Sequence, residues 1–155
     1  MENIETVIDF YQNYNEDKRM HVNSLEFIRC KEIISRYLLG DTMSILDCGG
    51  GTGVFSFWLA NRGHNVSLID FVPKHIGIAK KHQEDNEVRL ASMDIGDARD
   101  LPCEDGMFDL VLLMGPLYHL TEKHDRLEAL REAYRVLKPN RRIICEVIST
   151  PATRF

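Results

Sequence analysis

Residues 47–53 read Asp-Cys-Gly-Gly-Gly-Thr-Gly, and this stretch lies between two apolar segments of different character. Ile45 and Leu46 precede it in a short run typical of a buried strand, and Val54 opens a segment whose apolar residues recur with helical spacing. A glycine-rich turn between a strand and a helix lets backbone approach a ligand closely and directs the free N–H groups of the first helical turn at it. The stretch therefore predicts a cofactor site.

The spacing of the glycines distinguishes between two kinds of cofactor. The dinucleotide fingerprint requires Gly-x-Gly-x-x-Gly or Ala, but in the two registers available here the last position falls on Val54 or Ser56. Instead, the strand ends in an acid, Asp47, and alternate residues from there to Gly53 are glycine. This pattern resembles motif I of the class I S-adenosylmethionine-dependent methyltransferases. A nicotinamide oxidoreductase remains a less favoured alternative.

Further segments extend the resemblance in the order of the family. Residues 65–70 are typical of a second strand that ends in Asp70, at the roughly 20-residue distance where a ribose-binding acid is expected. Residues 96–102 resemble the loop after the third strand, residues 108–114 the fourth strand, and residues 130–148 the helix, turn and fifth strand.

The resemblance implies S-adenosyl-L-methionine as the cofactor and gives roles to the acids at the strand ends. It implies that Asp47 helps to organise the glycine loop and the cofactor's ammonium group, that Asp70 binds the ribose hydroxyls, and that Asp97 contacts the adenine amino group. Phe71 either packs against the adenine or has only a structural role. The full set of expected cofactor-binding residues is Asp47, Gly49, Gly51, Asp70, Phe71, Asp97, Ala98 and Met114.

His119 is the candidate catalytic residue. Residues 114–120 resemble a bacterial small-molecule branch of the family, related to the ubiquinone and menaquinone type, in which the substrate pocket opens at this point. Histidine can accept a proton near neutral pH, although methyl transfer can also be accelerated by positioning and exclusion of water alone. The alternative is that His119 is structural. The other histidines show no metal-ligand spacing, so we expect no metal and a surface position for His21, His64, His75, His82 and His124.

Strands alternate with helices from residue 44 onward, which predicts an α/β fold with right-handed crossovers. The expected fold is a Rossmann-like, doubly wound parallel sheet with strand order 3-2-1-4-5. Strands are expected at Ser44–Cys48, up to Asp70, within Val88–Ile95, at Phe108–Met114 and at Arg142–Ile148, and helices at Val54–Arg62, from Pro73, and at about Thr121–Leu137. Asn140 stands where the family commonly has glycine, and asparagine tolerates a left-handed conformation.

The domain is expected to consist of an N-terminal helical lid, residues 1–42, over a core formed by residues 43–155. Tyr11, Tyr14 and Arg19 are candidate lid residues, with simple packing and solvation as the favoured alternative. The family's C-terminal antiparallel strands are missing from this sequence, so we expect either a truncated or a reduced form. Because an open edge strand invites pairing, a homodimer or another protective contact is expected to cover the edge of the fifth strand.

The composition of the chain indicates which kinds of binding partner and which cellular compartment to expect. The formal net charge is −5 and basic residues form no stripe, so nucleic acid is not expected as a substrate. Four scattered cysteines and the absence of a signal peptide or membrane-length apolar run favour a cytoplasmic protein with no membrane contact. The predicted function is methyl transfer to a small-molecule acceptor; the alternative is a non-catalytic S-adenosylmethionine-binding protein or methyltransferase fragment.

Overall fold

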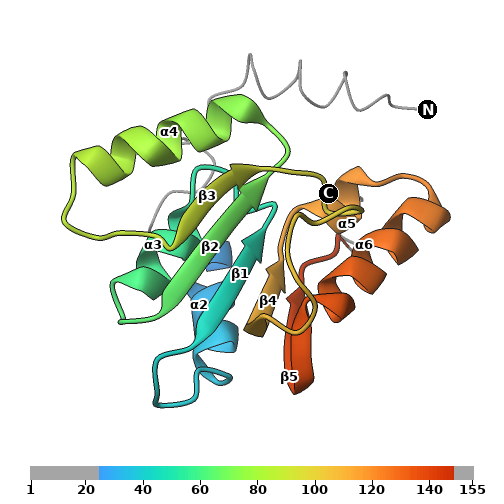
Figure 1. Cartoon of the computed structure of the whole chain (residues 1–155), viewed down its shortest axis with the longest axis horizontal. Coiled ribbons are helices and arrows are strands. Elements are labelled where there is room, and N and C mark those ends of the chain that lie inside the picture. The colour runs from blue at the N-terminus through green and yellow to red at the C-terminus, as the bar shows by residue number, and fades with distance from the viewer. Residues whose placement is uncertain (1–24, 149–155) are drawn as a thin grey trace.

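Five parallel strands form the single sheet of the computed structural model, which describes residues 25–148 (Figure 1). The strands are β1 (Ser44–Cys48), β2 (Asn65–Asp70), β3 (Ser92–Ile95), β4 (Phe108–Leu113) and β5 (Leu137–Cys145). Their order is β3-β2-β1-β4-β5, and every pairing is parallel. The predicted fold class and strand order are confirmed. The candidate lid residues Tyr11, Tyr14 and Arg19 lie outside the described residues.

Helices cover both faces of the sheet, as parallel connections require. They are α2 (Leu25–Ser35), α3 (Val54–Ala60), α4 (Pro73–Glu84), the short α5 (Pro116–His119) and α6 (Lys123–Arg135). The buried residues of α2, α3 and α4 share one apolar cluster with Ile45, whereas those of α6 share the other with Leu46. Successive strand residues point to opposite faces, so β1 is buried on both sides and forms the centre of the core.

Because all five strands are parallel, their carboxyl ends, called the strand tips below, lie at one edge of the sheet. The loops after β1, β2, β3 and β4 meet there. Pro73 occupies the first turn of α4, as expected from its fixed backbone angle. No helix in the described part of the chain has the length and apolar character needed to cross a bilayer.

The start of β5 differs from the prediction. The strand begins at Leu137 rather than Arg142 and ends at Cys145. Its pairing with β4 is interrupted, because Phe108 pairs with Leu137 while Leu110 already pairs with Arg142. The intervening Lys-Pro-Asn-Arg residues bulge out of the ladder, and Asn140 adopts the expected left-handed conformation there with a φ of 61°.

Smaller differences concern helix ends. The helix expected from Thr121 to Leu137 begins at Lys123 and ends at Arg135, because Glu122 is still extended and Leu137 already pairs with β4. The helix after the glycine loop ends at Ala60 rather than Arg62. These shifts leave the positions of the strand tips unchanged.

Candidate functional site

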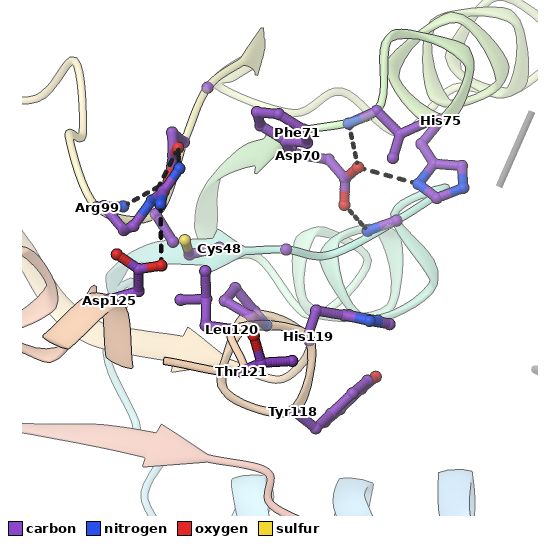
Figure 2. Close-up of a pocket in the computed structure, with 18 residues that line it drawn as sticks. Cys48, Asp70, Phe71, His75, Arg99, Tyr118, His119, Leu120, Thr121 and Asp125 are labelled. Atoms are coloured by element: carbon purple, nitrogen blue, oxygen red, sulfur yellow. Dashed lines mark hydrogen bonds and ion pairs between the residues drawn. The ribbon is translucent and has the colours of Figure 1, made fainter. Parts of the chain in front are cut away.

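A cavity of about 150 Å³ opens at the carboxyl edge of the sheet (Figure 2). It is lined by the loops that follow β1, β2, β3 and β4, and by residues of α5 and the start of α6. Seven predicted site residues line it: Gly49, Gly51, Asp70, Phe71, Asp97, Ala98 and His119. Asp47 and Met114 do not.

The glycine loop packs directly against the residues that follow β4. Gly49 has a φ of 73°, and a Cβ placed on it would lie 2.4 Å from Cδ of Pro116. From the opposite side, a Cβ on Gly115 would lie 3.0 Å from the carbonyl oxygen of Gly49. Gly51 also has a positive φ, 58°. The floor of the cavity is therefore bare backbone at Gly49 and Gly51, and the two segments pack this closely because neither Gly49 nor Gly115 carries a side chain.

Asp70 lies at the tip of β2, is 6% exposed and accepts three hydrogen bonds. The N–H of Gly51 donates to Oδ2 at 2.8 Å, and the N–H of Val72 donates to Oδ1 at 2.9 Å. Nδ1 of His75 lies 2.9 Å from Oδ1. The carboxylate thereby ties the glycine loop to the first turn of α4 (Figure 2).

His75 is a correction to the expectation that the remaining histidines lie on the surface. It is 4% exposed and lines the cavity. The sequence signal for it was available, because Pro73 marks the first turn of a helix, and a side chain two residues further on lies in the same turn, close to the strand tip that carries Asp70.

On the other side of the cavity, Arg99 joins two acids (Figure 2). Its Nη2 and Nε donate to Asp97 at 2.6 and 3.0 Å, and its Nη1 lies 3.2 Å from Oδ2 of Asp125 in the first turn of α6. Burial opposes ionisation of Asp97, but the hydrogen bonds and charge of Arg99 prevail and lower the pKa of that carboxyl. The sequence reading missed Arg99 because its second partner is distant in the chain.

Asp47 supports the glycine loop from below instead of lining the cavity. It is fully buried, and Oγ of Ser56 donates to its Oδ2 at 2.6 Å. A Cβ on Gly50 would lie 2.5 Å from that same oxygen. Burial, with a further contribution from the charge of Asp70, raises the pKa of Asp47 to about 6 against the hydrogen bond from Ser56.

The loop after β4 carries the candidate base. His119 is the last residue of α5, lines the cavity, and its ring lies 4.6 Å from that of Tyr118, centroid to centroid. Met114 precedes this loop and is buried in the apolar cluster that α2, α3 and α4 form with the sheet. Its side chain therefore contributes to the core behind the site.

The part of the chain that builds this site is similar to known proteins. Residues 45–140 match a protein-family model described as a methyltransferase domain. The chain is 35% identical over 112 residues to the demethylmenaquinone methyltransferase of Lactococcus lactis, covering 70% of this chain and 43% of that protein.

Two solved structures are similar in fold. The PH0226 protein of Pyrococcus horikoshii OT3 has a TM-score of 0.74 and 27% identity, over 88% of this chain and 64% of that one. A structure from Methanosarcina mazei, described as a SAM-dependent methyltransferase, has a TM-score of 0.66 and 27% identity, over 73% and 55% of the two chains. The chain spans about half the length of the curated relatives that it matches.

Proposed function

Because the chain belongs to the methyltransferase-domain family, we propose that it binds S-adenosyl-L-methionine and transfers the methyl group to a small molecule. The observation that carries the proposal is the placement of Asp70 and Asp97 around one cavity whose floor is the bare backbone of Gly49 and Gly51. The similar protein from Lactococcus lactis is named a demethylmenaquinone methyltransferase. This name supports a small-molecule acceptor.

The residues around the cavity fit this cofactor better than a dinucleotide. Asp70, Asp97 and Asp125 all line the cavity, and only Arg99 among the lining residues carries a fixed positive charge. Such a lining favours a ligand with a positive charge over a pyrophosphate. When bound, the cofactor supplies an electrophilic methyl group on a sulfonium. We propose that Asp70 holds the ribose, that Asp97 and Ala98 contact the adenine, and that Phe71 packs against it.

The chain's own contribution to the reaction is positioning. In-line displacement requires the acceptor to lie opposite the sulfur, with water excluded. We propose that the acceptor enters beside α5, where Tyr118 and His119 line the cavity, and that His119 accepts a proton from it. His119→Ala is expected to lower turnover about 100-fold and leave S-adenosylhomocysteine affinity within threefold. Unchanged turnover would remove His119 from the mechanism.

Calorimetric titration tests cofactor binding directly. S-adenosylhomocysteine is expected to bind, and NAD, titrated in parallel, is expected to give no heat of binding. Binding of neither compound by folded protein would overturn the proposal. A non-catalytic S-adenosylmethionine-binding role is the second candidate. Binding without turnover across a panel of quinone-type and other small acceptors would favour it.

We also propose a homodimer in which a second copy covers β5. Among the described residues, β5 is an edge of the sheet with no partner on its outer side, and Val147 and Ile148 just beyond it are 67% and 59% exposed. Open strand edges recruit further strands. Sedimentation velocity is expected to show a dimer at micromolar concentration; a monomer throughout the accessible range would contradict this proposal alone.

We further propose that the protein is cytoplasmic and has no nucleic-acid partner. The net charge of −5 disfavours phosphate backbones, and all four cysteines are free thiols, as is usual in a reducing compartment.

A further inference from the structure

We propose that His75 is a positioning residue that fixes the carboxylate of Asp70 for the ribose of the bound cofactor. The inference rests on the proposed function, since it gives His75 a task only if Asp70 holds a ribose. It concerns a buried histidine that the sequence had suggested would be on the surface.

The contact itself defines the direction of the hydrogen bond. Nδ1 of His75 lies 2.9 Å from Oδ1 of Asp70, and both side chains are nearly buried, 5% and 8% exposed. A carboxylate oxygen only accepts, so the proton must be on Nδ1. A hydrogen bond to a charged acceptor is stronger than one between neutral groups, and water does not weaken it here. His75 is therefore an effective restraint on the side chain of Asp70.

The three donors are distributed unequally over the two oxygens of Asp70. Among the described residues, Oδ1 accepts from Val72 and His75, whereas Oδ2 accepts only from Gly51. Each carboxylate oxygen has about two acceptor positions. Oδ1 is thereby filled, and Oδ2 keeps one position for a ligand. His75 thus determines which oxygen the ribose hydroxyl meets.

The contact also joins segments that must stay in register. Gly51 belongs to the loop after β1, Asp70 to the tip of β2, and His75 to the first turn of α4. Rotation of the Asp70 carboxylate would release the N–H of Gly51 and with it the loop that forms the floor of the cavity. His75 therefore acts on the ligand through Asp70 and the glycine loop.

The position of the donor provides the test, with S-adenosylhomocysteine as the probe in calorimetric titrations. His75→Asn places an amide nitrogen where Nδ1 lies, whereas His75→Gln carries it one carbon further, at the place of Nε2. We expect the asparagine variant to keep the affinity within about threefold of wild type, and the glutamine variant to lose roughly tenfold. Both substitutions are polar amides, so loss of the ring and of apolar packing affects them alike.

His82→Gln is the matched control, because His82 lies near the end of the same helix, is exposed, and contacts the ring of Phe57 rather than the cavity. It should bind with wild-type affinity. Equal affinities for the asparagine and glutamine variants, whether retained or reduced, would overturn the positioning role while leaving the proposed function intact. Failure of the wild-type protein to bind S-adenosylhomocysteine would instead overturn the proposed function.

Discussion

Gly49 meets two requirements at one position, each of which excludes a side chain. Its φ of 73° is left-handed, and an added Cβ would lie 2.4 Å from the Pro116 ring. Gly63 provides the matched control, since its φ is 88° but nothing lies within 4 Å of its added Cβ. Alanine at Gly63 should lower the free energy of unfolding by about 1 kcal/mol through backbone strain, and Gly49→Ala should lose more, because the contact with Pro116 adds to the same strain.

Only Gly49→Ala should also displace the loop after β4. We expect this displacement to move the floor of the cavity by about an ångström and to lower the affinity for S-adenosylhomocysteine at least tenfold. Calorimetry and urea unfolding on both variants separate the two effects. Equal affinity for the two variants would show that the contact between these loops does not shape the binding site.

Asp47 makes stability depend on pH with a sign opposite to that of most acids. Its pKa rises from 3.8 to about 6 in the folded protein, so the folded state binds more protons between these values. The corresponding stability is complete below pH 4 and is lost as pH rises through 6. Asp47→Asn has no such proton, so between pH 5 and 7 the wild-type protein should lose about 1 kcal/mol relative to this variant.

Urea unfolding at the two pH values measures that difference. Asp109→Asn is the control, because contacts of Asp109 with Ser44, Lys138 and Arg141 outweigh its burial and lower its pKa, so the carboxyl stays ionised throughout this range. Its stability relative to wild type should not change between pH 5 and 7. A wild-type loss that persists in Asp47→Asn would assign the titration to another group.

Single residues at strand tips were the most predictable part of the site. Asp70 closes an apolar strand segment, and Asp97 lies two residues beyond the end of β3, so the order of strands and loops in the sequence places both backbones at the carboxyl edge. What sequence spacing does not report is the hydrogen-bond network around them. Asp47 also ends a strand, yet its side chain turns below the loop toward Ser56. Alternation of faces along β1 puts Asp47 on the side of α3 and its neighbour Cys48 in the cavity.

At the scale of secondary-structure elements, α6 holds the loop that follows the Asp97 segment. Arg135 donates from Nη2 to the carbonyl of Leu101 at 3.0 Å and from Nη1 to that of Cys103 at 2.7 Å. It also pairs with Glu132, whose carboxylate accepts the N–H of Leu101 at 2.8 Å. Arg135→Leu would leave these partly buried acceptors without a donor, and we expect a loss of about 2 kcal/mol in unfolding free energy.

Arg131→Leu is the control on the same helix. Arg131 also has a glutamate three residues earlier, Glu128, but Arg131 itself is exposed and does not bridge to a loop in the described part of the chain, and pairs with an exposed partner contribute about 0.5 kcal/mol or less. Thermal or urea unfolding of the two variants provides the comparison. Similar losses would mean that the connection between α6 and the loop contributes nothing to stability.

The irregular start of β5 shows why element boundaries are harder to predict than element order. The Lys-Pro-Asn sequence is typical of a turn, and the chain does bulge there, but Leu137 pairs with Phe108 before the bulge. Pairing of that kind depends on a strand 29 residues earlier, counted from Phe108 to Leu137. Local sequence carries no signal for it, whereas the alternation of strands and helices alone predicts the fold class.

For the whole molecule, ligand binding and folding are linked because the cavity is built from four separate loops. A ligand that binds only the folded state adds about 2.7 kcal/mol to the free energy of unfolding at a free concentration 100 times its dissociation constant. For a chain of this size, that increase corresponds to a rise of roughly 5–10 °C in Tm. S-adenosylhomocysteine should produce such a rise, whereas NAD at the same concentration should produce none.

The shift also reports on each loop, since a tenfold loss of affinity removes about 1.4 kcal/mol of the added stability at fixed ligand concentration. His75→Gln and Gly49→Ala should both show reduced shifts, whereas His82→Gln and Gly63→Ala should show the full wild-type shift from their own starting Tm. The two affected residues lie on different elements, α4 and the loop after β1, and Asp70 connects these elements through its hydrogen bonds with His75 and Gly51. A full shift in both site variants would mean that the ligand binds elsewhere on the molecule.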